Sequence, residues 1–521
     1  MNVLVKRFGD FFKGVISGFD RIVFKGSLPS LSHPKGAENF LRSKNVLNKE
    51  YKSWALERSR ELAEAYEHLA KETTGQGVEF INSWTDRKEE IARERQRELG
   101  VKRGVVGAWS CQETASSYRA SFDRRSGYPR LRRYNIRAKH LYVYMDHEDF
   151  GFMNIRMQTW FPYHIQICLN GREWLRRSLE KSGADFTMVG NKLIHAADFE
   201  LVQQILDSQK EARFIEILDG FPPTAFPTMA STLDERFRYY WTLWQSEWAT
   251  DYICDDPARL NAITESLVKH AFMTGTSQRI LRYMGRRETP SGFPHPRFGK
   301  RVVSRIRKFY DGVRVRHWLG SNSVKVYNEQ NVLRVETTIN APEDFKVWRR
   351  AADEPEDAPK KLRPMRKSVA DARPRADISQ AVNDRMVEKL AAFSEETSVD
   401  ELLKPITSRK RKGGRKIRAL DPTGKDRELF KIISDASFDV NGMSNKEIRK
   451  RLAGSDPKDE KAARRLSAKI SRLLRLLRDH GLIRKLPHRR RYVMTTSGRQ
   501  ITTAINAVLS VSNKKLMEMA A

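Results

Sequence analysis

The spacing of hydrophobic residues changes several times along the N-terminal part of this chain. Apolar residues at every second position are typical of strands, whereas three- and four-residue spacing is typical of amphipathic helices. Strand-like alternation occurs over 14–26, 104–113, 140–145, 152–161 and 163–169. Helix-like spacing occurs over 50–73, 85–99, 172–181 and a short segment after Ala197. This order predicts an α+β domain over residues 1–195 that contains a β-meander.

The central part of the chain has the pattern of helices followed by strands. Apolar and aromatic residues at helical spacing over 232–252 and 257–272 predict two helices. Alternating segments joined by short polar turns come next, at 313–319, 323–327 and 332–339. We therefore expect residues 196–345 to complete the body of the protein, as a helical insert and a β-meander within a mixed or antiparallel sheet.

The composition changes over residues 346–425, where Pro, Glu, Lys and Arg dominate around one amphipathic helix. Such a composition is typical of a linker. A basic run around Gly413-Gly414 lies near its end and offers these candidate nucleic-acid contacts: Arg409, Lys410, Arg411 and Lys412. We expect this arm to follow a phosphate backbone without a fixed shape.

Residues 426–521 predict a C-terminal domain. Its central feature is the segment 462–480, where apolar residues form one helical stripe and basic residues cover the other faces. Upstream, Ser444 and Glu447 have the spacing of a capping box that opens a shorter helix. Downstream, two strand-like pieces flank a basic turn, and a last helix begins near Ser497.

The order helix, helix, helix, basic hairpin, helix and the sequence HGLIRK…RRRYVMTTSGR resemble the MarR/ArsR type of winged helix-turn-helix domain. In that family the third helix enters the major groove of DNA and the wing contacts the adjacent backbone. Some wings of the family bind protein or RNA instead. The resemblance implies these nucleic-acid contacts: Arg465, Lys469, Arg472 and Arg475 on the third helix, and Arg489, Arg490 and Arg491 in the wing.

Two stretches of the body carry a second resemblance. The sequences LYVYMDHEDFGFMNIRMQTWFPYHIQICLNGREWL and SNSVKVYNEQNVLRVETTIN resemble a family of bacterial hypothetical proteins that share this N-terminal region and this winged-helix end. That family has no established activity. The resemblance therefore implies one continuous architecture and assigns no catalytic residue.

The net charge narrows the range of partners. With 97 Lys and Arg against 65 Asp and Glu, the formal charge of +32 favours DNA or RNA as partner. No apolar run approaches the roughly 18 residues of a transmembrane helix, so we expect no membrane partner. The three cysteines lack metal-binding spacing and favour a reducing, cytoplasmic location, with the bacterial nucleoid as the expected place. The number of subunits is left open.

No phosphate-binding loop, zinc-protease motif, nucleophile elbow or kinase motif occurs in the sequence. Looser candidates lie on one face of the strands expected over 313–339, namely Arg314, Arg316, Lys325, Tyr327, Arg334 and Glu336. The Arg and Lys side chains would hold a phosphodiester, and Glu336 would bind a metal or act as a base. Tyr327 would be the nucleophile if the reaction proceeds through a covalent intermediate. The stretch KVYNEQNVLRVE is also loosely similar to a pattern of plasmid and phage replication initiators. A solvated face with cross-strand ion pairs explains the same residues.

Two sets of acids are candidate ligands for Mg²⁺ or Mn²⁺. Asp146, which is also a catalytic candidate, lies with Glu148 in an acidic turn. Glu247 and Asp251 are four residues apart on an expected helix, and Asp20 would complete a carboxylate cluster of the ribonuclease H kind. Ordinary turn residues and surface acids paired with arginines give the same patterns.

The leading hypothesis is a nucleic-acid-binding protein of a mobile element or phage-like system that acts on DNA. Its expected fold is α+β and multidomain, with a basic linker and a C-terminal winged helix. Whether the body is also a metal-dependent nuclease or strand-transfer enzyme is undecided at this point. One alternative is a non-enzymatic protein that scaffolds a structured RNA. The other is a transcriptional regulator, against which the large basic body argues.

Overall fold

The computed structural model divides into two compact units. The sheet unit comprises Phe12–Asp255 and Gln330–Ala381, and the C-terminal unit comprises Met1–Phe11, Asp256–Glu329 and Val382–Ala521. The described residues are 3–85, 87–226, 238–275, 277–286, 301–309, 312–351, 353–355, 357–391, 399–435, 438, 442–453, 459–486 and 490–510. Within these residues, no helix combines the length and the apolar character needed to cross a bilayer.

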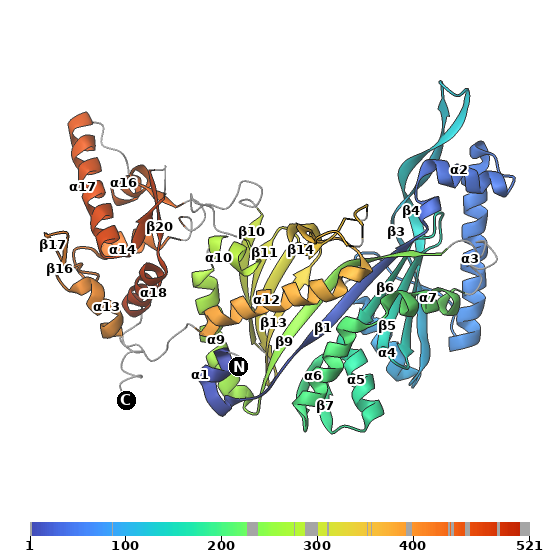
Figure 1. Cartoon of the computed structure of the whole chain (residues 1–521), viewed down its shortest axis with the longest axis horizontal. Helices are drawn as coiled ribbons and strands as arrows, with labels where there is room; N and C mark the ends of the chain where they lie inside the picture. Colours follow the sequence, from blue (N-terminus) through green and yellow to red (C-terminus); the bar gives the residue numbers. More distant parts are fainter. Residues whose placement is uncertain are drawn as a thin grey trace. The chain divides into compact units, whose positions relative to one another are not determined.

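The sheet unit is an α+β structure around one large mixed sheet, as the alternating patterns predicted (Figure 1). Its strands follow the order β13-β9-β1-β6-β5-β4-β3-β2, and only β2 and β3 run parallel. The strand bounds are β1 Phe12–Ser27, β2 Glu79–Phe80, β3 Gly104–Asp123, β4 Tyr128–His147, β5 Gly151–Gln158, β6 Ile165–Asn170, β9 Tyr240–Cys254 and β13 Val332–Ile339. The strands expected near 14–26, 140–145, 152–161 and 163–169 are confirmed as β1, β4, β5 and β6.

One face of this sheet is apolar and covered by helices. Phe19, Ile22 and Phe24 of β1 share this face and belong to the main core cluster. The helices over this face are α2 Pro34–Ser43, α3 Tyr51–Thr74, α7 Phe214–Ala225 and the first turns of α12 Ala372–Ala391. Figure 1 shows α2 and α3 beside the long hairpin of β3 and β4.

In the described structure the opposite face of the sheet is covered at both ends, and we call it the polar face. At one end, α5 Gly171–Ser182, α6 Phe199–Ser208 and the hairpin of β7 Phe186–Val189 and β8 Lys192–Ala196 bury Ile16 and Ile253. At the other end, α4 Lys88–Glu98 packs its Ala92 near Tyr144 and Phe152. Polar side chains of β1, β6 and β9 lie between these two ends.

The C-terminal unit contains three further antiparallel strands, and α9 packs against two of them, β11 and β12. Its first elements are α1 Val3–Phe8, α9 Pro257–Thr274, α10 Ser277–Tyr283, β10 Val302–Phe309, β11 Gly312–Leu319 and β12 Asn322–Glu329. Its last elements are α13 Val399–Thr407, β16 Lys410–Lys412, β17 Arg415–Ile417, α14 Arg427–Ile433, β18 Met443–Ser444, α16 Asn445–Ala453, α17 Glu460–Asp479, β19 Ile483–Lys485, β20 Arg491–Met494 and α18 Thr496–Ser510. The last three strands form a sheet in the order β18-β20-β19.

The helix expected over 232–252 is wrong, because residues 240–252 belong to strand β9. Residues 232–237 lie outside the described residues. Trp241 and Trp248 are seven positions apart, an odd spacing that would place them on opposite faces of a regular strand. Both are nevertheless buried in the same core cluster. The register of β9 with β1 shifts at Trp244, which becomes an extra residue of the strand. That bulge turns the two-residue alternation of a strand into a seven-residue spacing that matches a helix.

The composition of 346–425 suggested a shapeless linker, but much of this segment is ordered. It includes the hairpin of β14 Lys346–Arg349 and β15 Lys361–Pro364 as well as α12. The basic arm is a tight hairpin of β16 and β17, turned by Gly413 and Gly414 with φ of 54° and 74°. Arg415 pairs with Asp479, and this ion pair ties the hairpin to α17.

Candidate metal centre

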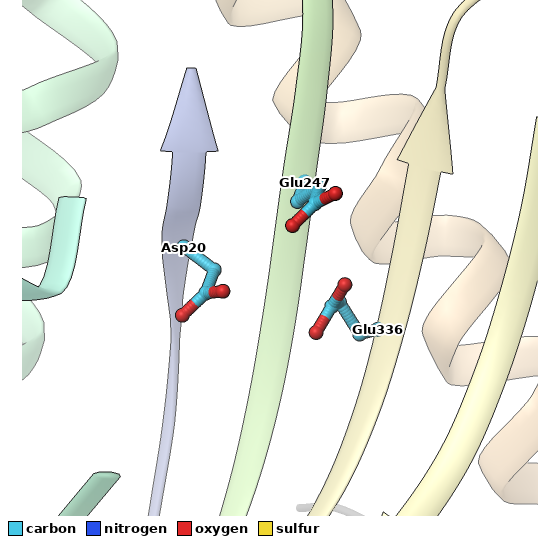
Figure 2. A group of neighbouring side chains, drawn as sticks. All are labelled: Asp20, Glu247 and Glu336. Carbon is cyan, nitrogen blue, oxygen red and sulfur yellow. The ribbon is translucent and has the colours of Figure 1, made fainter. Parts of the chain in front are cut away.

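The polar face carries three carboxylates on three neighbouring strands (Figure 2). Asp20 lies on β1, Glu247 on β9 and Glu336 on β13, and one oxygen atom from each lies within 4.8 Å of the other two. The exposed fractions of Asp20 and Glu336 are 8 % and 1 %, while Glu247 is partly exposed. Among the described residues, these three form the one group of acids, cysteines or histidines that is close enough to hold a metal ion. We call it the carboxylate cluster.

Strand register brings the three acids together, and a bulge lies beside them. Thr338 on β13 pairs with Glu247, so Glu336, two residues away, shares the face of Glu247. Arg21 on β1 pairs with Glu247 from the other side, and a register shift just before Arg21 leaves Asp20 as an extra residue. Bulges re-aim side chains and are over-represented next to active sites. Asp20 shares the face of Gly18, which pairs with Ala249, and the bulge turns Arg21 to that face as well.

A buried ion-pair network adjoins the carboxylate cluster. Arg334 donates from Nη1 to Asp20 Oδ1 at 2.9 Å, and its Nε and Nη2 form a bidentate pair with Asp251 at 2.6 and 2.8 Å. Nη2 of Arg172 lies 3.1 Å from Asp251 Oδ2. Arg334, Asp251 and Arg172 are all buried. The two guanidinium groups therefore compensate the charge of Asp251, and Arg334 also fixes the position of Asp20.

Electrostatics makes the carboxylate cluster receptive to a cation. Two carboxylates 4.8 Å apart repel by about 3–4 kcal/mol at an effective dielectric constant of about 20. Burial lowers the pKa of Arg172, against the opposing effect of Asp251. Burial also acts to lower the pKa of Arg21, but nearby groups including Glu247 raise it above its ordinary value. Arg21 thus stays charged beside the cluster, 3.4 Å from Glu89 of α4.

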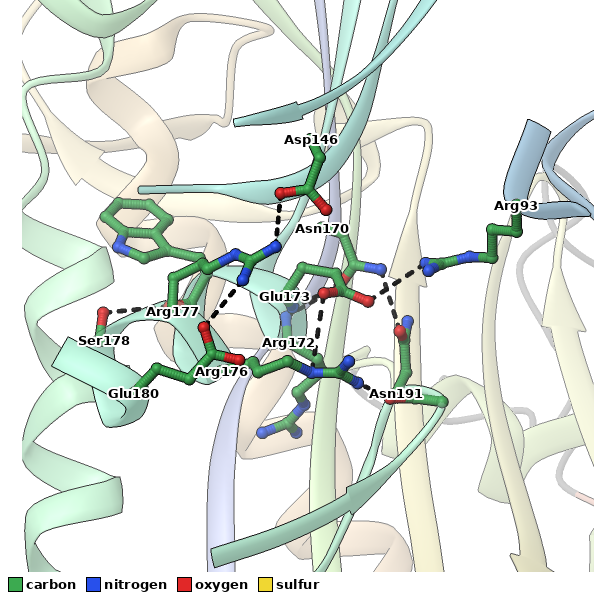
Figure 3. Close-up of polar contacts among 12 residues, drawn as sticks. Arg93, Asp146, Asn170, Arg172, Glu173, Arg176, Arg177, Ser178, Glu180 and Asn191 are labelled. Carbon is green, nitrogen blue, oxygen red and sulfur yellow. Dashed lines mark hydrogen bonds and ion pairs between the residues drawn. The ribbon is translucent and has the colours of Figure 1, made fainter. Parts of the chain in front are cut away.

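Two asparagines tie the cluster to the α5 end of the polar face (Figure 3). Asn170 caps α5 by accepting hydrogen bonds of 2.9 and 3.1 Å from backbone amides of its first turn. Its amide donates to Asn191 Oδ1 at 3.0 Å, and Asn191 Nδ2 lies 3.5 Å from Asp20 Oδ1. The carbonyl oxygen of Asn191 accepts a 2.7 Å bond from Arg334. The turn between β7 and β8 is therefore part of the site.

The donor set suits a hard divalent cation. Mg²⁺ and Mn²⁺ prefer oxygen ligands, and one or two carboxylates with water or substrate oxygens complete their coordination in phosphoryl-transfer sites. The three acids supply such oxygens, and no cysteine or histidine belongs to the group among the described residues. A cation held there could polarise a phosphodiester and lower the pKa of bound water.

The expected ligands Asp146 and Glu148 belong to no such group in the described structure. Asp146 is buried and pairs with Arg177 of α5 (Figure 3), and it also accepts a 2.8 Å hydrogen bond from Gln96. Glu148 is exposed and lies 3.8 Å from Lys181. Asp146 therefore connects β4 to α4 and α5, in the manner of a structural ion pair.

The other residues expected on the 313–339 face are divided between the two units. Lys325 and Tyr327 lie on β12 of the C-terminal unit, with the Lys325 ammonium 5.1 Å from the Tyr327 ring centre. On β11, Arg314 lies over Phe309 and Arg316 over Trp318. These contacts place cations and aromatic rings side by side on a partly exposed surface.

The expectation that β13 presents a solvated face is wrong, because Arg334 and Glu336 are each 1 % exposed. Val332 of the same strand packs into the cluster formed by α5, α6 and β8, which covers the polar face at this end. Asp251 is likewise buried, on a strand instead of the expected helix. The sequence pattern gave no role to Arg172 or Asn191, although Asn170 and Gly171 stand where a strand turns into a helix, which is a signal for a capped helix start.

The C-terminal unit presents a separate basic surface on α17. Its expected contacts Arg465, Lys469, Arg472 and Arg475 are all exposed, whereas Ile470, Leu474 and Leu477 are buried in the local core. Within the described part of the chain, Arg465, Lys469 and Arg475 make no ion pair. In the expected wing, Arg490 is exposed, Arg491 pairs with Glu447 at 2.7 Å, and Arg489 lies outside the described residues.

Comparison with known proteins adds no further assignment. No family model, no curated protein and no solved structure matches this chain.

Proposed function

We propose that this protein binds DNA and hydrolyses or transfers its phosphodiester bonds with a divalent cation held by the carboxylate cluster. The observation that carries the proposal is the convergence of Asp20, Glu247 and Glu336 from three strands that are far apart in the sequence. Adjacent carboxylates repel one another, and the bond from Arg334 to Asp20 holds one of them in this group. This arrangement of three acids, in which Glu247 is partly exposed, supports a functional role.

Each residue near the cluster has a role in this proposal. Asp20, Glu247 and Glu336 would hold Mg²⁺ or Mn²⁺, which would supply Lewis-acid activation of the phosphodiester. Arg334 is a positioning residue, because it binds Asp20 while its other nitrogen atoms are engaged by Asp251. Arg21 lies on β1 opposite Glu247, is partly exposed, and would balance negative charge that develops on the phosphate.

The C-terminal unit would deliver the sheet unit to DNA. A winged-helix assignment is supported by the element order α14, β18, α16, α17, β19, β20, α18 and by the sheet order β18-β20-β19. In such domains the helix that corresponds to α17 enters the major groove. The exposed row of Arg465, Lys469, Arg472 and Arg475 supports the same role, and the net charge of +32 favours a polyanionic partner.

The test is cleavage of single-stranded and duplex DNA by the full-length protein with Mg²⁺, Mn²⁺ or EDTA. Cleavage should require the cation and should fall about a thousandfold in Glu336→Gln and in Asp20→Asn, which corresponds to roughly 4 kcal/mol of lost transition-state stabilisation. Calorimetric titration with Mn²⁺ should show binding to the wild type and not to these variants. Glu148→Gln, an exposed acid outside the cluster, is the matched control.

Melting curves in EDTA separate loss of metal from loss of fold. Variants that melt like the wild type but bind no Mn²⁺ support the proposal. Unchanged Mn²⁺ binding and cleavage in Glu336→Gln would refute it. A wild-type protein that cleaves nothing and retains one discrete RNA during purification would favour the RNA-scaffold alternative.

A further inference from the structure

A cavity of about 340 Å³ lies on the polar face of the sheet unit. Its lining includes Lys25, Arg156, Trp244 and the histidines His140 and His164, together with several hydroxyl and amide side chains. No carboxylate belongs to the described lining. The cavity is therefore a positively charged, hydrogen-bonding environment, in contrast to the carboxylate cluster.

Strand register places this cavity and the carboxylate cluster on the same face. Lys25 is four residues beyond Arg21 on β1, so the two side chains share a face, and Arg21 pairs with Glu247 of the cluster. Across β6 and β5, Lys25 pairs with Gln166 and Gln166 pairs with Arg156. A strand rises about 3.3 Å per residue, so Lys25 lies about 13 Å along β1 from Arg21. A single extended ligand can reach both places.

Lys25 and a lysine from outside the lining, Lys367, lie against Trp244 of the cavity. The ammonium groups of Lys25 and Lys367 lie 3.6 and 3.9 Å from the ring centre of Trp244. Trp244 is 38 % exposed and is the extra residue of the bulge in β9. Neither lysine makes an ion pair with a described residue. Arg156 pairs with Glu113, but its Nε is buried without a hydrogen-bond partner.

The titration of Lys25 reflects this excess of positive charge. Burial, Arg156 and Lys367 together lower the pKa of Lys25 to about 8. Burial lowers the pKa of His140 to about 4, and burial and Lys25 lower the pKa of His164, so both imidazoles are neutral at pH 7. A bound anion would favour the charged form of Lys25 and raise its pKa.

We propose that this cavity binds a phosphate group of the same nucleic-acid strand whose phosphodiester bond is held at the carboxylate cluster. Lys25 and Arg156 contact the phosphate oxygens, and Trp244 holds the two lysine ammonium groups in place through cation–π contacts. The inference rests on the proposed function, because the strand is the ligand that would span both places. It assigns the polar face a backbone-binding track that begins at the metal centre.

Inorganic phosphate carries the same chemistry as a backbone phosphate, so the test must distinguish the two sources. The probe is acetylation of lysines by acetic anhydride at pH 8, followed by mass spectrometry of peptides from the full-length protein. At this pH about half of Lys25 is neutral and reactive, whereas below about 1 % of an ordinary lysine is. All arms contain EDTA, so the result does not depend on whether the protein cleaves DNA or binds a metal.

A short single-stranded oligothymidylate should slow acetylation of Lys25 about tenfold at about ten times its Kd, because only the free fraction reacts. Lys13, an exposed lysine on the same strand β1, is the internal control and should react at an unchanged rate. Equal protection by inorganic phosphate at the same phosphate concentration would show that free phosphate is the ligand and overturn the strand assignment. No protection by either ligand, or equal protection by thymidine without phosphate, would overturn the inference as a whole.

A variant gives a second, independent readout. Lys25→Gln should weaken oligothymidylate binding in EDTA and reduce the slope of log affinity against log salt by about 0.7, the value for one phosphate contact on a single strand. Lys13→Gln should leave both quantities unchanged if the contact is local to the cavity. Equal affinity and equal slope in Lys25→Gln and the wild type would contradict the proposal.

Discussion

The replacement Arg334→Met tests whether the buried network holds the carboxylate cluster together. Arg334 makes a bidentate pair with Asp251, a 2.9 Å bond to Asp20 and a 2.7 Å bond to the carbonyl oxygen of Asn191. Methionine fills much of the space but leaves Asp251, which is fully buried, with only Arg172 as its cationic partner. Removing one member of a buried pair costs about 3–5 kcal/mol, because the remaining charge stays desolvated.

The magnitude can be checked by thermal unfolding of the full-length protein. In a domain of this size 1 kcal/mol corresponds to about 2–4 °C, so Tm of the sheet unit should fall by roughly 6–20 °C in EDTA. The loss should be smaller in Mn²⁺ than in EDTA, because a bound cation compensates Asp20 in place of the guanidinium group. Arg213→Met, which removes an exposed pair with Glu216, should change stability by less than about 0.5 kcal/mol.

Two outcomes would refute this reasoning. If Tm in EDTA falls no more in Arg334→Met than in the Arg213→Met control, the network does not carry the stability assigned to it. If Arg334→Met is destabilised equally in EDTA and in Mn²⁺, the cation does not compensate Asp20 in place of the guanidinium group.

Three further predictions concern other parts of the chain. Lys25 must be protonated to hold an anion, and its pKa lies at about 8. The affinity for oligothymidylate, measured by fluorescence anisotropy, should therefore fall as the pH rises through 8. Lys25→Gln should flatten this pH dependence. Reversing the charge of Arg472 and Arg475 to Glu should weaken duplex binding and lower the slope of log affinity against log salt by about one unit per lost phosphate contact. An unchanged duplex affinity would exclude α17 as the groove helix. Ser444→Ala removes the hydroxyl that accepts a 3.3 Å hydrogen bond from the amide of Glu447. Hydrogen exchange over α16 should accelerate in proportion to a loss of about 1 kcal/mol of helix stability. Unchanged exchange would show that this cap is dispensable.

Local patterns predicted much of the sheet unit. Period-two alternation located β1, β4, β5 and β6, because each of these strands buries one face against helices. The capping box at Ser444 is confirmed, since Ser444 N donates to Glu447 at 2.7 Å while Glu447 N donates to Ser444. These features depend on neighbours within a few residues, which periodicity can reveal.

The carboxylate cluster was only partly predictable. The sequence pattern groups Asp20 with Glu247 in one candidate site and assigns Glu336 to another. The three acids lie on strands that are far apart in the sequence, so no local pattern shows that these strands pair. The bond between Arg334 and Asp20 joins positions 314 residues apart. Asp251 has the residue type of a ligand but compensates two buried arginines instead, and only its three-dimensional surroundings show this.

Two of the three register shifts in the pair of β1 and β9, at Asp20 and at Trp244, have a consequence for insertions and deletions. The extra residue at Asp20 shifts the register by one position, and the extra residue at Trp244 on the opposite strand shifts it back. Between them, the strands run out of phase with the rest of the ladder for only a few residues. Removing one bulged residue alone would slide the remainder of the pair and turn its side chains to the wrong face. The lengths of these two distant segments can therefore change only together, which makes them a single unit of sequence variation.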